Sequence, residues 1–157
     1  MKPKVYVETT VISYLTAWPS RDVIVAAHQQ ITDEWWRTKR QSFDLYASQL
    51  VVTEAQAGNP DMAERRLSAL TEVKLLEITQ ETVELADDLI RRGPVPEKAA
   101  EDAIHIAVAV VNGLDYLISW NCKHIANARM RDRIEWVCRA RGYQPVVICT
   151  PEELLED

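Results

Sequence analysis

The chain has 157 residues, of which 47% are hydrophobic and 27% are charged, a balance that is ordinary for a globular protein with a sizeable core. We expect one domain over residues 1–157 and no membrane span, because no apolar run approaches the roughly 20 residues that cross a bilayer. Taken alone, the formal net charge of −6 argues against nucleic-acid binding.

Short β-rich runs alternate with helical patterns along the whole chain. In chain order the predicted elements are a strand at 4–7, helices at 11–15 and 20–39, a strand at 43–47, helices at 50–57 and 61–70, a strand at 73–78, helices at 79–92 and 99–111, a strand at 115–119, a helix at 128–141 and an edge strand at 146–149. This alternation predicts a three-layer α/β/α domain, with a mostly parallel sheet of four or five strands.

Local signals mark the ends of several helices. Thr9 or Thr10 is suited to cap the first helix, and Asn59-Pro60 provides a cap and a first-position proline for the helix at 61–70. Thr79 caps the helix that Gly93-Pro94 ends.

The long helix at 20–39 has an apolar stripe with a residue at every fourth position. We expect this stripe to face the core; its members are Val23, Ala27, Ile31 and Trp35. Trp36 lies off the stripe, so we expect it to be exposed or to face a partner chain, because aromatic residues are enriched at interfaces.

The helix at 99–111 is apolar almost all round and is therefore predicted to be buried. Its polar exceptions are Glu101, Asp102 and His105. Burying an unpaired charge is costly, so Asp102 is a candidate functional residue, while one of the two acids is expected to be a solvated acid at the helix start. His105 is either a ligand or, as we prefer, a core histidine that supports one.

Other polar residues lie where predicted strands end, the edge at which open parallel sheets bind ligands. Glu8 ends the first strand, Glu54 lies in the helix after the second, and Ser119 and Asn121 end the fourth. Three of them have a plainer interpretation: Glu8 as an acid favoured by a helix dipole, Glu54 as a surface acid and Asn121 as a turn residue.

Carboxylates that converge on one spot repel one another unless a cation holds them. Glu8, Glu54 and Asp102 would offer only oxygen ligands, which suit Mg²⁺ or Mn²⁺. Such an ion activates water and neutralises a phosphoryl group, which is the chemistry of phosphodiester hydrolysis.

Ten of the 18 lysine and arginine residues fall into four groups: Arg37/Lys39/Arg40, Arg65/Arg66, Arg91/Arg92 and Arg129/Arg131/Arg133. An acidic pocket with such a basic rim would bind a metal and then a polyanion, so the overall charge leaves the partner open. Lys123 and His124 either touch phosphate or lie on the surface.

Three cysteines, Cys122, Cys138 and Cys149, occur without C-x-x-C spacing. Their odd number argues for free thiols in a reducing cytoplasm and against a disulfide framework or a zinc site. The N-terminus lacks the apolar segment of a signal peptide, which also agrees with a cytoplasmic location.

Four stretches, in order and at the expected spacing, resemble the signatures of PIN domains. They are 5–12 (VYVETTVI), 52–58 (VTE, then three residues and a glycine), 101–107 (EDAIHIA) and 118–121 (ISWN). More narrowly, the chain is similar over essentially its whole length to the toxin ribonucleases of VapC type. The resemblance implies a PIN-like α/β/α fold and an endoribonuclease that depends on Mg²⁺ or Mn²⁺.

Carried over residue by residue, the resemblance makes Glu8, Glu54 and Asp102 metal ligands. Asn121 occupies the position of a fourth acid, and Ser119 is the hydroxyl residue beside it. Two departures matter: Glu8 stands where the family usually has aspartate, and the neutral Asn121 weakens any second metal position.

The function implied by the resemblance is the toxin half of a type II toxin–antitoxin pair, with an RNA substrate, a cognate antitoxin and a homodimeric assembly. A catalytically silent PIN-fold module that binds RNA or protein is one alternative. A small-molecule phosphohydrolase is another, although the sequence has neither a glycine-rich phosphate loop nor an aspartyl-nucleophile motif.

Overall fold

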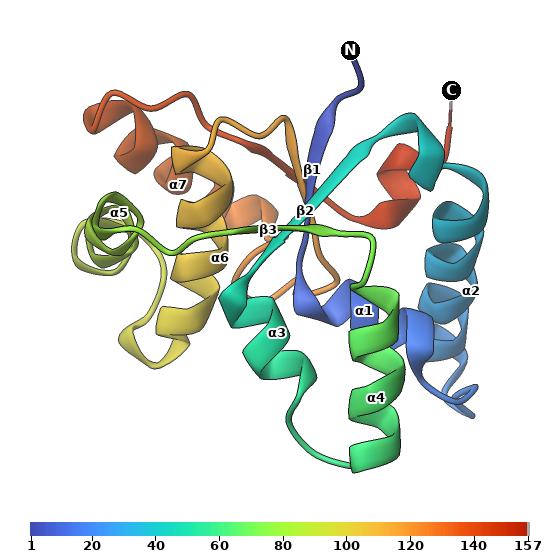
Figure 1. Ribbon diagram of the computed structural model, residues 1–157. Helices are drawn as coiled ribbons and strands as arrows, with labels where there is room; N and C mark the ends of the chain where they lie inside the picture. Colours follow the sequence, from blue (N-terminus) through green and yellow to red (C-terminus); the bar gives the residue numbers. More distant parts are fainter. Residues whose placement is uncertain (157) are drawn as a thin grey trace.

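The structure is a computed structural model that describes residues 1–156 (Figure 1). Within this range five strands form one sheet in the order β3-β2-β1-β4-β5, and every pair of neighbours is parallel. The strands are β1 (Lys4–Val7), β2 (Asp44–Ser48), β3 (Lys74–Leu76), β4 (Tyr116–Ile118) and β5 (Val147–Cys149). The predicted parallel sheet is confirmed, and it has five strands.

Helices cover both faces of the sheet, which confirms the three-layer α/β/α architecture. Figure 1 shows α5, α6 and α7 gathered on one side, and α1, α2 and α4 on the other. The helices are α1 (Thr9–Thr16), α2 (Val23–Thr38), α3 (Gln49–Ala55), α4 (Pro60–Ala69), α5 (Gln80–Arg91), α6 (Ala100–Val111) and α7 (Ala128–Ala140), with short 3-10 turns η1 (Arg40–Ser42), η2 (Glu97–Ala99) and η3 (Pro151–Leu154). Nowhere in residues 1–156 is a helix both long and apolar enough to cross a membrane.

The core is built around β1 and α6. In the central strand β1, Val5, Tyr6 and Val7 are fully buried, because strands lie on both sides and helices on both faces. The whole stretch 105–110 of α6 is buried, as its apolar sequence predicts, and the exposed residues of this helix lie in its first turn. That first turn carries Glu101 and Asp102.

The strand order reverses between β1 and β4. Strands β2 and β3 follow β1 on one side, whereas β4 and β5 extend the sheet on the other. In open α/β sheets the crevice for a ligand lies beyond the carboxyl ends of the strands at such a reversal. Glu8 and Ser119 stand at this point, directly after β1 and β4, and the backbone N–H of Glu8 donates to the carbonyl of Ile118 at 3.1 Å.

The start of α1 differs from the prediction. Neither Thr9 nor Thr10 is the cap; both belong to the helix, and the carboxylate of Glu8 accepts a hydrogen bond from the Thr10 N–H at 3.2 Å. The two threonine hydroxyls are therefore free to bind carboxylates. The other caps are confirmed, with Asn59 before Pro60 on α4 and Thr79 on α5.

The predicted core stripe of α2 is wrong in its first half. The helix begins at Val23, after an Asp22 cap, and Val23 is 81% exposed because the first two turns extend past the core. The buried residues of α2 are Thr32 and Trp35. Trp36 is half-buried against Trp35, with the Arg40 guanidinium 5.0 Å from its ring centre.

Candidate active site

Glu8 is a buried carboxylate held by hydroxyl groups. Its side chain is 3% exposed, and Oε1 accepts hydrogen bonds from Thr10 Oγ1 at 2.6 Å and from Ser119 Oγ at 2.5 Å. Hydrogen bonds to an ionised acceptor are short and strong, so these two donors fix the orientation of the carboxylate. They bring no positive charge that would neutralise it.

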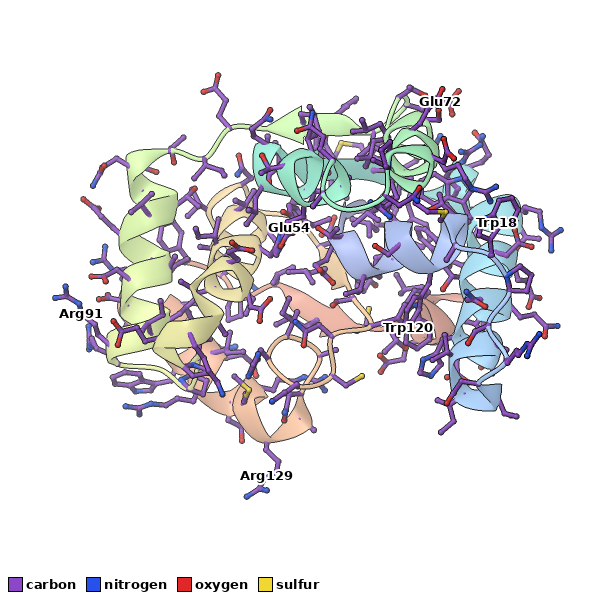
Figure 2. All side chains as sticks on the ribbon, turned by 90° about the horizontal axis from the view of Figure 1, so that it is seen from below. Trp18, Glu54, Glu72, Arg91, Trp120 and Arg129 are labelled. Carbon is purple, nitrogen blue, oxygen red and sulfur yellow. The ribbon has the colours of Figure 1, made fainter. Side chains whose placement is uncertain are left out.

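Glu54 reaches the same place from the end of α3. Figure 2, which looks onto the carboxyl edge of the sheet, shows it in the space between α1, α3 and α6. Its Oε1 accepts hydrogen bonds from Thr9 Oγ1 at 2.5 Å and from His105 Nε2 at 2.7 Å. Partial burial raises the pKa of Glu54, but the hydrogen bonds from His105 and Thr9 outweigh burial and hold the pKa below its usual value.

His105 is fully buried and uses both ring nitrogens. Nε2 contacts Glu54, and Nδ1 lies 2.7 Å from the hydroxyl of Tyr6, which also contacts Ser48 Oγ at 2.9 Å. Burial raises the pKa of Tyr6 far above its usual value, so the phenol stays protonated. His105 is thus a satisfied core histidine that contacts the candidate site from behind.

Glu101 belongs to the site, although the sequence alone did not select it. Its carboxyl forms a hydrogen bond with Glu54, and this contact is the main reason that the pKa of Glu101 lies above its usual value. One signal could have found it. Glu101 precedes His105 by four residues, so the two lie on one face of α6, and the face that carries His105 meets Glu54.

Asp102 lies in the first turn of α6 but beside a different partner. Its Oδ2 is 3.1 Å from Nδ1 of His124, and its side chain is 19% exposed. In residues 1–156 one group of acidic and histidine side chains has ligand atoms within 4.8 Å of one another, and it comprises Glu8, Glu54 and His105. The structure therefore brings Glu8 and Glu54 together and places Asp102 outside this group, paired with His124.

Ser119 and Asn121 connect the two halves of the site through the loop after β4. The N–H of Asn121 donates to Ser119 Oγ at 2.9 Å, and Asn121 Oδ1 accepts from the His124 N–H at 3.0 Å. Hydrogen bonds thus run from Asp102 through His124, Asn121 and Ser119 to Glu8. The amide oxygen of Asn121 holds the turn that presents His124.

The donor set fits a hard divalent cation. Glu8 and Glu54 supply carboxylate oxygens from two elements, and the carboxyl of Glu101 lies beside Glu54. Oxygen ligands of this kind suit Mg²⁺ or Mn²⁺, which would relieve the repulsion between the acids. His105 is better assigned as a partner of Glu54, because Nε2 must carry a proton to donate to that carboxylate.

Comparison with known proteins agrees with this architecture. No protein-family model matches the sequence, and neither does any curated protein. Among solved structures, VapC20 from Mycobacterium tuberculosis, a Sarcin-Ricin loop cleaving toxin, is 17% identical with a TM-score of 0.59, over 76% of this chain and 91% of that one. VapBC2 from Rickettsia felis, bound to a DNA fragment from its promoter, is 10% identical with a TM-score of 0.61, over 94% of this chain and 98% of that one. The fold of this chain is that of a VapC-like PIN domain.

Proposed function

We propose, from the VapC-like PIN fold, that this chain is a metal-dependent endoribonuclease, active as a single domain of residues 1–157 and serving as the toxin of a type II toxin–antitoxin pair. One observation carries the proposal: the carboxylates of Glu8 and Glu54 meet at the reversal point of the sheet, each held by hydroxyl donors. The description of VapC20 as a Sarcin-Ricin loop cleaving toxin supports RNA as the substrate.

In this proposal Glu8, Glu54 and Asp102 hold Mg²⁺ or Mn²⁺. Asp102 uses one carboxylate oxygen toward His124, and a carboxylate has two. When bound, the cation supplies water activation and neutralises charge on the phosphodiester. Thr10, Ser119 and Thr9 hold the carboxylates in place.

Ser119 and Asn121 would orient the attacking water or the substrate. Both lie in the loop that follows β4, next to Glu8. The exposed side chains of Lys123 and Arg129, in and just after this loop, are placed to bind RNA phosphates. By contrast, the guanidinium of Arg66 donates to the carbonyls of Ala55 and Ala57, so that arginine has a structural task.

A cleavage assay with matched variants tests the activity. Purified chain is incubated with single-stranded and structured RNA in Mg²⁺, in Mn²⁺ or in EDTA. We expect cleavage only with a divalent ion, and loss of cleavage in Glu8→Gln and Asp102→Asn. Glu64→Gln, an exposed change on α4, should cleave like the native chain.

The departures at Glu8 and Asn121 make a silent module the alternative. RNA binding without cleavage in any divalent metal would support that alternative and refute the nuclease. Hydrolysis of phosphate monoesters, but not of RNA, would instead support a small-molecule phosphohydrolase.

We also propose a cognate antitoxin as protein partner and a homodimer as the assembly. The R. felis structure contains VapBC2 with its promoter DNA, which supports a partner of this kind. Trp18, Val23 and Ile24 are 68%, 81% and 69% exposed around the start of α2, and they offer an apolar surface to a second chain. Three free thiols agree with a cytoplasmic location. Light scattering of the purified chain at micromolar concentration tests the dimer.

A further inference from the structure

A chain of buried hydrogen bonds reaches Glu54 from the interior of the protein. Ser48 Oγ lies 2.9 Å from the hydroxyl of Tyr6, that hydroxyl lies 2.7 Å from Nδ1 of His105, and Nε2 of His105 lies 2.7 Å from Oε1 of Glu54. Ser48, Tyr6 and His105 are fully buried, whereas Glu54 is partly exposed in the space between α1, α3 and α6 (Figure 2).

With the ring of His105 in its neutral form, the chemistry of the groups fixes the direction of the donors. An ionised carboxylate only accepts, so Nε2 of His105 carries a hydrogen and donates to Glu54. In a neutral imidazole the other nitrogen is an acceptor, and Nδ1 therefore receives the hydrogen of the Tyr6 hydroxyl. Ser48 then donates to the oxygen of Tyr6. Every donor in the chain points toward Glu54.

Alternatives to this role are weak. The ring of His105 is completely enclosed, and its Nε2 carries the hydrogen that it donates to Glu54. A protonated Nε2 has no free lone pair, so His105 is unsuited as a metal ligand. Packing alone does not explain the arrangement either. A buried polar group is costly unless it is hydrogen-bonded, and an apolar residue would fill the space between β1 and α6 without that cost.

We propose that Tyr6 and His105 are positioning residues, which hold the Glu54 carboxylate in the orientation that receives the divalent cation. This inference rests on the proposed metal-dependent function. Tyr6 selects the tautomer of His105, and His105 in turn fixes Oε1 of Glu54. Partners behind metal ligands, such as these, typically change metal affinity by about 10–100-fold when they are removed.

Two sets of variants separate this role from packing. Tyr6→Phe removes the hydroxyl and keeps the ring, and Tyr46→Phe is the matched control, because Tyr46 is the register partner of Tyr6 on β2. His105→Gln places an amide N–H where Nε2 stands and keeps a donor to Glu54. His105→Asn places its polar atoms nearer to the position of Nδ1 and loses that donor.

Calorimetric titration of the purified chains with Mn²⁺ gives the main result. We expect affinity about tenfold or more below the native value in Tyr6→Phe and His105→Asn, near-native affinity in Tyr46→Phe, and recovery in His105→Gln. If all four variants bind Mn²⁺ with the same affinity as one another, at the native value or below it, the proposal is overturned. A native chain that binds neither Mn²⁺ nor Mg²⁺ also overturns it.

The tautomer is read without any variant. Nitrogen chemical shifts of the imidazole rings in the metal-free native protein should show His105 as the neutral Nε2–H form. An Nδ1–H form or a doubly protonated ring contradicts the proposal, even if the variants fail to fold. A native chain that binds Mn²⁺ with this tautomer but cleaves no RNA would refute the nuclease function and leave the positioning role standing.

Discussion

Ser119 donates a hydrogen bond of 2.5 Å to the carboxylate of Glu8, 111 residues away in the sequence. The bond joins the ends of β4 and β1, the two strands between which the sheet order reverses. Within residues 1–156 no ion pair involves Glu8. Its negative charge is therefore oriented by hydroxyls without being neutralised, which is the state in which a carboxylate attracts a cation.

Replacing Ser119 by alanine should weaken the metal site without unfolding the protein. A hydrogen bond to a charged group contributes about 1.5–3 kcal/mol, so we expect roughly a tenfold or greater fall in Mn²⁺ affinity and cleavage rate. Thr10 still donates to Glu8, which should keep the change in thermal stability small. Titration calorimetry and an RNA cleavage assay measure the two quantities. Ser42→Ala, at an exposed position, is the control, and native affinity in Ser119→Ala would contradict the assigned role.

Glu101→Gln should make the metal-free protein more stable at neutral pH, and the gain should vanish in acid. The hydrogen bond to Glu54 raises the pKa of Glu101 above its ordinary value of 4.5. The folded state therefore binds this proton more tightly than the unfolded chain does, and the stability gained is lost as the pH rises through the folded pKa. A glutamine keeps a donor to Glu54 at every pH.

Thermal unfolding in EDTA measures this difference between variant and native chain. The two unfolding temperatures should be similar near pH 4. Above the raised pKa of Glu101, the variant should unfold at a higher temperature than the native chain. Asp102 raises the pKa of Glu101 and His105 lowers it, and both remain in the variant. A constant difference across the pH range would mean that the two glutamates do not share a proton.

The three thiols should differ sharply in reactivity. Burial raises the pKa of Cys138 to about 11 and that of Cys149 to about 12, whereas Cys122 is exposed in the loop after β4. The thiolate is the reactive form, so a thiol reagent near pH 8 should modify Cys122 rapidly and the other two only after unfolding. The native chain should titrate one thiol and the denatured chain three. Rapid reaction of two or more thiols in the native chain would contradict the fold around β5 and α7.

The sequence predicts the sheet and the strand-end acids because both follow from local patterns. Glu8 needs only a buried strand before it and a parallel sheet around it. Glu101 and Asp102 could not be told apart in this way, because adjacent positions on α6 point in directions that depend on how the helix crosses the sheet. The exposed Val23 shows the same limit, since a stripe at helical spacing does not reveal where the core under a helix ends.

The neutral side chain of Asn121 leads to a prediction about how many metal ions the site binds. A neutral amide adds no charge, and the three carboxylates proposed as ligands suffice for one divalent ion but are few for two. We therefore expect one well-occupied Mn²⁺, held by Glu8, Glu54 and Asp102. Stoichiometry from calorimetric titration measures this number, and two tight ions in the native chain would refute it.

Variants of Asn121 test the same point through activity. Asn121→Asp keeps an oxygen acceptor for the His124 N–H and adds charge beside the site, so it should preserve or raise cleavage. Asn121→Ala loses the acceptor, which loosens the turn between Ser119 and His124, and it should reduce cleavage less than Asp102→Ala does. Initial rates at saturating and limiting Mn²⁺ separate weaker metal binding from slower chemistry. Because the aspartate retains the turn and strengthens the electrostatic attraction for the cation, abolished cleavage in Asn121→Asp would overturn this account of the site.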